Sequence, residues 1–256
     1  MPLLTESIIW PSHGSSNPGP QWRMAQSRFA TGLLSWSDAN RRDFPWRDPE
    51  SGSWPVLLAE MLLRQTDAKR VVPVFEQLVV VAPTPLALAA ISVPELERIL
   101  RPLGLYHQRA AGLRALGDAV ASLHGGTLPT DIGTLRTLPH VGPYAAGAVA
   151  VFCRGERASL PDINVARVGG RYFGMPTRTR NEQSAVASRV AKNAPTPRVR
   201  DFYLAILDLS ALVCKPKPRC PQCPLRAACR FARAGTPGLI ARRTVRQHQV
   251  PVGSSA

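Results

Sequence analysis

The sequence predicts an all-α fold. Apolar residues recur at helical spacing over segments such as 22–36 and 105–123. Helix-start signals precede several segments, and Ser92-Val93-Pro94-Glu95 has the pattern of a capping box. No stretch shows a convincing period-two alternation typical of a strand. The chain has 256 residues, of which 45% are hydrophobic, so it can bury one large core or two small ones and wholesale disorder is excluded.

In the first half, residues 1–21 are rich in Pro, Gly, Ser and Asn and are expected to form a flexible leader. The second helix is expected to be capped by Ser51 or Ser53. Proline at position 85 favours a helix start, because its missing N–H costs nothing there. The expected helices cover 22–36, 54–66, a segment opening at Thr84-Pro85, and another opening at 92–95.

In the second half, Gly125-Gly126 ends the long amphipathic helix over 105–123. Thr130 and Asp131 cap a brief turn that runs to Leu138. Further helices are expected over 142–152, 165–173, 182–192 and 200–213. Residues 233–256 contain several arginines and no acid, which predicts a solvated basic tail.

The charge of the chain points to a polyanionic partner. There are 32 basic and 17 acidic residues, a formal net charge of +15, and counterion release favours binding of such a chain to nucleic acid. No apolar run reaches the ~18 residues that a membrane helix needs, and no basic n-region precedes an apolar stretch at the start. We therefore expect no membrane association and a cytoplasmic location, associated with the nucleoid in a prokaryote.

Lysine is rare, and its absence from the middle of the chain limits the chemistry. The four lysines are Lys69, Lys192, Lys215 and Lys217, so the other 28 cations are arginine. No side-chain primary amine lies between residues 70 and 191. Schiff-base chemistry would therefore have to recruit a remote lysine.

Four of the five cysteines form a tight cluster. Cys214, Cys220, Cys223 and Cys229 have the spacing Cys-x5-Cys-x2-Cys-x5-Cys. Four thiolates so close together can enclose either Zn²⁺ or an iron–sulfur cluster. Zinc ribbons usually contain two short Cys-x2-Cys pairs, whereas this chain has one, so the spacing favours an iron–sulfur cluster.

A glycine-containing turn leads into a helix of small residues at Leu138-Pro139-His140-Val141-Gly142-Pro143-Tyr144. Amides at such a helix start form a phosphate site, although an ordinary interhelical hairpin has the same pattern. Asp162 follows Tyr144 by eighteen residues. It can cap the next helix, or its carboxylate can stabilise a cationic transition state.

With the cysteines following, this order resembles the helix-hairpin-helix (HhH-GPD) DNA glycosylases with an iron–sulfur cluster, the endonuclease III and MutY superfamily. The resemblance covers roughly residues 22–232. Besides the hairpin and the cysteines, it rests on Phe44-Pro45-Trp46-Arg47, on residues 59–66 (AEMLLRQT), and on Asp162, Asn164 and Arg167-Val168.

The resemblance implies two helical lobes with the active-site cleft between them. Residues 47–153 would form a six-helix barrel with the helix-hairpin-helix. Residues 22–46 and 154–232 would form the cluster-bearing lobe, with a [4Fe–4S] cluster on the four cysteines. The implied partner is double-stranded DNA with a mismatched or damaged base, bound by a monomer. The target base is flipped into the cleft, as in glycosylases generally.

The resemblance also assigns roles to single residues. Asp162 is matched to the catalytic carboxylate, Glu60 to the acid of MutY proteins, and Tyr144 to a residue that contacts the flipped base. Without the resemblance, Glu60 would be read as a partner of Arg64 at i+4. The residues expected to contact DNA are Arg47, Arg64, Gln65, His140, Val141, Gly142 and Asn164, with His140 standing where the family usually has glycine.

Tyr144 decides the expected reaction type. Bifunctional relatives have lysine at this position, MutY typically has serine, and the thymine mismatch enzymes have tyrosine. The resemblance therefore implies a monofunctional enzyme, without lyase activity, that removes thymine or uracil opposite guanine. The chain also leaves no room for the C-terminal domain of MutY. Two alternatives stay open: an adenine glycosylase acting on A:G or A:oxidised-G pairs, and a non-catalytic DNA lesion-binding protein.

Overall fold

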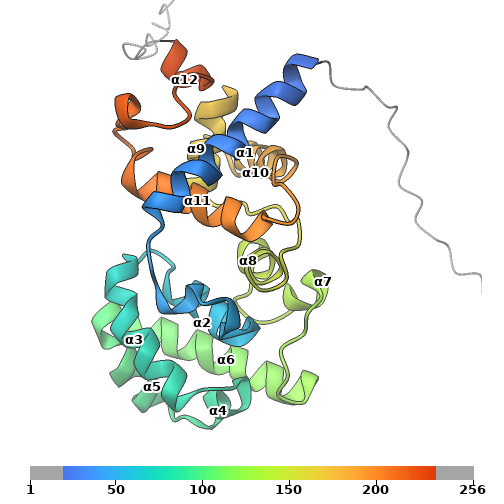
Figure 1. The fold of residues 1–256 in the computed structure, drawn as a ribbon. Helices are drawn as coiled ribbons and strands as arrows, with labels where there is room; N and C mark the ends of the chain where they lie inside the picture. Colours follow the sequence, from blue (N-terminus) through green and yellow to red (C-terminus); the bar gives the residue numbers. More distant parts are fainter. Residues whose placement is uncertain (1–19, 235–256) are drawn as a thin grey trace, which may run out of the picture.

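The structure, a computed structural model, describes the backbone of residues 20–234 and the side chains of residues 28–234. Within that range every regular element is a helix, which confirms the all-α prediction (Figure 1). Nearly all of the expected leader and basic tail lie outside the described residues. The elements are α1 (Pro20–Asn40), η1 (Pro45–Arg47), η2 (Pro49–Ser51), α2 (Ser53–Leu62), α3 (Ala68–Val81), α4 (Pro85–Ala90), α5 (Val93–Leu100), η3 (Arg101–Leu103), α6 (Tyr106–His124), α7 (Ile132–Leu135), α8 (Pro143–Arg154), α9 (Ile163–Phe173), α10 (Arg180–Ala191), α11 (Val199–Leu212), η4 (Cys220–Gln222) and α12 (Arg230–Arg233).

Most expected helix starts are confirmed by side-chain caps. The Thr84 hydroxyl accepts a hydrogen bond from the amide of Ala87, and the Asp131 carboxylate caps α7. The expected cap of α2 is wrong, because neither serine serves. The N-cap residue is Gly52, whose φ of 74° lies in the left-handed region that glycine tolerates.

Two helices differ from the sequence prediction for identifiable reasons. The predicted helix over 54–66 ends at Leu62, because Gln65 has φ 56° and cannot continue a right-handed helix. Helix α3 was not predicted, although it has an apolar face. Pro73 lies inside it, and proline normally interrupts a helix interior.

The buried residues form two hydrophobic clusters. One takes residues mainly from α2–α6, and the other mainly from α1 and α9–α11. Figure 1 shows α8 between these two groups of helices. Helix α8 contributes to both clusters, with Ala146 and Val149 in the first and Val151 and Phe152 in the second. The two lobes therefore share one helix, while the exact lobe boundaries stay predictions.

Small residues let the chain approach α8 closely. A Cβ atom on Gly147 would lie 2.9 Å from Leu160 Cδ2 and 3.0 Å from the backbone oxygen of Ser159. Only glycine allows the segment before Asp162 to lie against α8 in this way. This packing brings the start of α9 next to the start of α8. Among the described residues, no helix has the length and apolarity needed to cross a bilayer.

Candidate active site

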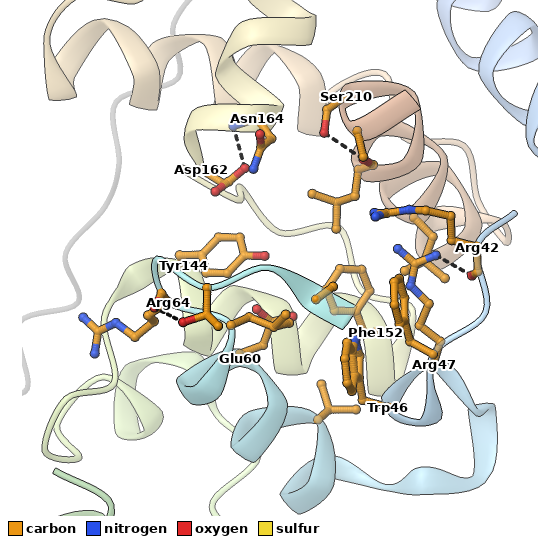
Figure 2. Close-up of a pocket in the computed structure, with 18 of the residues that line it drawn as sticks. Arg42, Trp46, Arg47, Glu60, Arg64, Tyr144, Phe152, Asp162, Asn164 and Ser210 are labelled. Carbon is orange, nitrogen blue, oxygen red and sulfur yellow. Dashed lines mark hydrogen bonds between the residues drawn. The ribbon is translucent and has the colours of Figure 1, made fainter. Parts of the chain in front are cut away.

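A pocket of about 530 Å³ opens between the two groups of helices (Figure 2). Its walls come from the loop before η1, from α2 and the turn after it, and from α8, α9 and α11. The structure brings seven of the predicted site residues to this pocket, whereas the three hairpin residues lie outside it. The seven are Arg47, Glu60, Arg64, Gln65, Tyr144, Asp162 and Asn164.

Glu60 lies on the pocket side of α2 and is only 7% exposed. Burial raises the pKa of its carboxyl from 4.5 to about 7, with the Asp162 charge adding to the rise; a hydrogen bond from Tyr144 and the charge of Arg47 act in the opposite direction. Glu60 therefore exchanges a proton near neutral pH, as acid–base catalysts do. The ion pair with Arg64 is not formed among the described residues: Arg64 Nη1 donates to the carbonyl of His140 instead, at 3.4 Å.

Tyr144 is the second residue of α8, and its hydroxyl is directed toward Glu60. Burial and the nearby carboxylates of Glu60 and Asp162 raise the pKa of the Tyr144 phenol well above its usual value. The phenol is thus a neutral hydrogen-bond donor at physiological pH. It can donate to Glu60 or to a polar edge of a bound base.

Asp162 is the N-cap residue of α9 and also lines the pocket. Its Oδ1 accepts hydrogen bonds from the amides of Asn164 at 2.7 Å and Val165 at 3.2 Å. These bonds fix the carboxyl group, and among residues 28–234 no donor contacts Oδ2. The capping and catalytic interpretations of Asp162 are therefore compatible, because they use different oxygens.

The hairpin between α7 and α8 has the backbone conformation that the expected phosphate site needs. His140 adopts a left-handed φ of 61° at the position where the family usually has glycine. Its ring packs against α6, since a Cβ atom on Gly112 would lie 3.3 Å from it. Gly142 caps α8 without a side chain, so the first amides of that helix face outward.

Two residues expected to contact DNA have buried side chains. The Val141 side chain is only 4% exposed in the core, and its amide donates to the Leu138 carbonyl at 3.1 Å. Arg47 is 7% exposed, and its guanidinium donates to both Asp208 oxygens at 2.9 and 3.0 Å. Arg47 is therefore part of the pocket wall.

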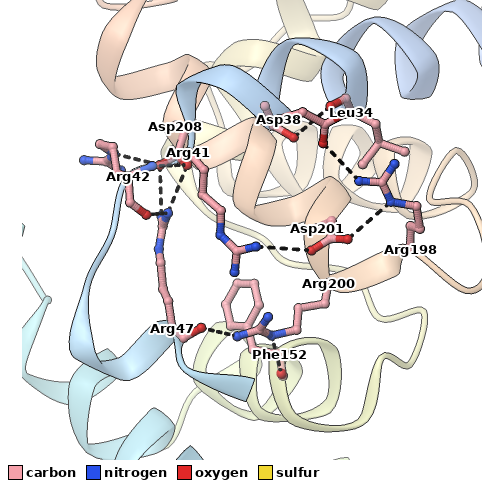
Figure 3. Close-up of polar contacts among 11 residues, drawn as sticks. Leu34, Asp38, Arg41, Arg42, Arg47, Phe152, Arg198, Arg200, Asp201 and Asp208 are labelled. Atoms are coloured by element: carbon pink, nitrogen blue, oxygen red, sulfur yellow. Dashed lines mark hydrogen bonds and ion pairs between the residues drawn. The ribbon is translucent and has the colours of Figure 1, made fainter. Parts of the chain in front are cut away.

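The partner of Arg47 is Asp208, a buried aspartate that was not predicted from the sequence. Asp208, on α11, is fully buried and also accepts from Arg42 Nε at 2.7 Å (Figure 3). On the same helix, Arg200 donates to the carbonyls of Arg47 and Phe152. These bonds tie the pocket wall and α8 to α11. The sequence does contain a sign of this residue, because Asp208 is an acidic residue within the apolar run Ile206-Leu207-Asp208-Leu209.

The four cysteines of the predicted cluster lie together on the other side of α9. All are free thiols, and all line one small, mostly apolar pocket with Val168, Tyr172 and Leu225. Burial raises the pKa of Cys223 to about 11, with the other three thiols contributing to the rise and a backbone hydrogen bond from Leu225 opposing it. Arg171 Nη1 lies 3.4 Å from Cys214 Sγ. Among the described residues, no group of three or more histidine, cysteine or acidic side chains has the arrangement to hold a metal ion.

The chemistry of this donor set is that of a thiolate-ligated cluster. Four thiols, one buried and three partly buried, line one pocket, and an apolar wall with one guanidinium donor is typical of such sites.

The fold and the site together define a helix-hairpin-helix repair protein. A family model described as "HhH-GPD superfamily base excision DNA repair protein" matches residues 58–193. The chain belongs to this family, and it is a DNA glycosylase of base-excision repair.

Its relatives are named for two different substrates, adenine and thymine/uracil. The chain is 38% identical over 220 residues to the adenine DNA glycosylase of Mycolicibacterium smegmatis, covering 84% of this chain and 73% of that protein. It is 34% identical over 208 residues to the thymine/uracil-DNA glycosylase of Pyrobaculum aerophilum, covering 78% and 89%. Among solved structures, a thermostable thymine-DNA glycosylase matches with a TM-score of 0.78 and 29% identity, covering 83% of this chain and 99% of that one.

Proposed function

We propose that the protein removes a mismatched base from double-stranded DNA by hydrolysis and leaves the strand intact. One observation carries this proposal: Glu60, Tyr144 and Asp162 line a single pocket whose described lining contains no lysine. Without an amine beside the sugar, no imine forms and the strand is not nicked. Water is then the nucleophile.

The three side chains have different roles in this reaction. As the C1′–N bond breaks, its electron pair leaves with the base and the sugar becomes cationic. Asp162, fixed by its two amide bonds, stabilises that cation and helps to place the water, which loses a proton as it adds to C1′. Glu60, which is mostly neutral below its pKa of about 7, donates a proton to the leaving base, and Tyr144 contacts the base that has been flipped into the pocket.

Thymine or uracil opposite guanine is the substrate that we propose. Tyr144 is the residue that the thymine mismatch enzymes have at this position, and the chain covers nearly the full length of the thymine/uracil relatives. A T:G wobble pair is partly destabilised already, so extruding its thymine costs less than opening a normal pair.

Adenine is the second candidate. Glu60 is the specific observation in its favour, because a carboxylic acid that is half-protonated at pH 7 can protonate a departing purine. The adenine relatives are also similar over most of this chain. A binder without activity is the least supported candidate, because burying the Glu60 carboxyl group in the pocket costs stability that binding does not require.

A panel of four duplexes tests the base and the reaction type together. Duplexes with T:G, U:G, A:G and A:oxidised-G pairs are incubated with the protein, and products are resolved before and after alkali. We expect alkali-dependent cleavage at T and U only, with no adduct trapped by borohydride. Excision of adenine alone would favour the second candidate, and a trapped adduct would show lyase activity. Binding without any excision would favour the non-catalytic candidate.

We also propose that Cys214, Cys220, Cys223 and Cys229 hold a [4Fe–4S] cluster. Such a cluster ties together the segment from α11 to α12 that packs on α9, so its contribution here is structural. Protein purified without oxygen is expected to be brown and to contain about four irons per chain. Cys223→Ser is expected to lower both the iron content and the thermal midpoint. Stoichiometric zinc without iron would contradict the proposal.

A further inference from the structure

Arg109, on the first turn of α6, has hydrogen-bond partners for its whole side chain. An arginine has five N–H groups, and the structure gives the guanidinium of Arg109 five acceptors. None of them is a carboxylate, so this is a network of backbone and hydroxyl contacts rather than an ion pair. Nε donates to Gly104 O at 3.0 Å, Nη1 to Met61 O at 3.4 Å and Leu62 O at 3.1 Å, and Nη2 to Arg64 O at 2.8 Å and Thr66 Oγ1 at 2.7 Å.

Two of these hydrogen bonds satisfy carbonyl groups at the C-terminal end of the helix that carries Glu60. The carbonyls of Met61 and Leu62 belong to the last turn of α2, where helix carbonyls lack intrahelical donors. A cation at a helix C-terminus is favourable for this reason and because it complements the helix dipole. Arg109 therefore anchors the catalytic helix at the end nearest the mouth of the pocket.

The other three acceptors lie beside two strained residues. Gln65 has φ 56° and stands between Arg64 and Thr66, which the guanidinium contacts on both sides. Leu105 has φ 52° and directly follows Gly104. Left-handed backbone at residues other than glycine persists only where surrounding contacts determine it. Arg109 provides such contacts for both turns.

Both turns have a solvent-exposed residue, and one of them lines the pocket. The turn of residues 64–66 lines the pocket, and Gln65 is exposed. The Leu105 side chain is 59% exposed although it is apolar. Two strained turns that are distant in sequence are thus joined by one partly buried side chain.

We propose that Arg109 is a positioning residue that holds the 64–66 turn and the 104–105 turn at a fixed spacing before DNA arrives. The inference rests on the proposed function, in which Arg64 and Gln65 meet the duplex beside the flipped base. A turn ordered in advance lowers the entropic cost of engaging the duplex. Extrusion of a paired base should therefore depend on Arg109, whereas the chemistry on an unpaired base should not.

Arg109→Lys is the test variant, because lysine keeps the charge but has three donors on one nitrogen and cannot contact both turns as the planar fork does. Arg98→Lys is the matched control. Arg98 is an exposed arginine of the same lobe whose ion-pair partner among the described residues is Glu95, at 3.0 Å. Thr66→Val is a second variant, in case Arg109→Lys fails to fold; it removes the hydroxyl that accepts from Arg109 Nη2 and donates to the Arg64 carbonyl.

Amide hydrogen exchange of the DNA-free protein measures how well the two turns are ordered. Single-turnover excision compares the rate on a single mismatch with the rate on the same base in an unpaired bubble. In Arg109→Lys we expect exchange of residues 63–66 and 104–106 to become about tenfold faster, since it loses at least two net hydrogen bonds. The mismatch rate should fall roughly tenfold or more and the bubble rate less than about threefold. Thr66→Val should show the same trend over residues 63–66 alone, and Arg98→Lys should match the wild type.

Unchanged exchange in either turn would overturn the proposal, as would equal loss of rate on both substrates. If the wild type excises no base from either substrate, the proposed function fails, and the exchange measurement still decides whether Arg109 holds both turns.

Discussion

Replacing Asp162 with asparagine will remove base excision and leave DNA affinity close to that of the wild type. Asparagine keeps the size of the side chain and an oxygen that can cap α9, so the fold should lose little stability. The variant loses only the negative charge that faces the cationic sugar. Removing one such electrostatic contact typically costs 10²–10³ in rate or more. Single-turnover excision and the Kd for a duplex with an abasic-site analogue measure the two effects separately.

Asp131→Asn is the matched control for this prediction. Asp131 is also an N-cap aspartate, and its carboxylate accepts from the Thr134 amide at 2.7 Å, but it does not line the pocket. Its replacement should change neither rate nor affinity. A single-turnover rate for Asp162→Asn within tenfold of the wild-type rate would show that Asp162 is not the catalytic carboxylate. Glu60 would then be the first residue to test for that role.

Local signals explain which parts of the site the sequence could predict. The cap at Asp162, the hairpin before Tyr144 and the cysteine spacing each occupy a short stretch of chain, so their patterns are visible without knowledge of the fold. Glu60 was ambiguous, because its environment depends on Tyr144 and Asp162, which lie more than eighty residues further along the chain. Its burial decided between a surface ion pair and a titratable group in the pocket.

Long-range contacts explain what the sequence could not predict. Asp208 and Arg47 are 161 residues apart, and Arg109 reaches Arg64 and Thr66 across more than forty residues. No periodicity or motif connects such partners. The early end of α2 has the same origin, because the left-handed Gln65 is held by a side chain from α6.

Glu60→Gln will stabilise the protein at high pH. The pKa of Glu60 is about 7 in the folded protein and near 4.5 when unfolded, so the folded state favours the neutral acid. The stability that this preference contributes is complete below pH 4.5 and is lost as the pH rises through 7. Glutamine is neutral at every pH. The free energy of unfolding should therefore change in favour of the variant by about 2–3 kcal/mol between pH 5 and pH 8. Denaturant melts at the two pH values measure this.

The same substitution will slow excision, because the amide can donate a hydrogen bond but cannot transfer a proton to the leaving base. General acid catalysis typically contributes 10²–10⁴ in rate, which sets the size of the expected loss. In the wild type the single-turnover rate should decline as the pH rises above about 7, where Glu60 ionises, and this step should be absent from the variant.

Glu76→Gln provides the control for both measurements, since it removes one negative charge from an exposed position of α3 in the same lobe. It should keep the wild-type pH profile and show no comparable gain in stability. A wild-type rate that rises through pH 7, and a variant that loses this rise, would show that Glu60 acts ionised, as a base toward water. The hydrogen bond from Tyr144 favours the ionised form of Glu60, whereas burial favours the neutral form. Whether the single-turnover rate falls or rises through pH 7 therefore shows which of the two forms of Glu60 is active once DNA is bound.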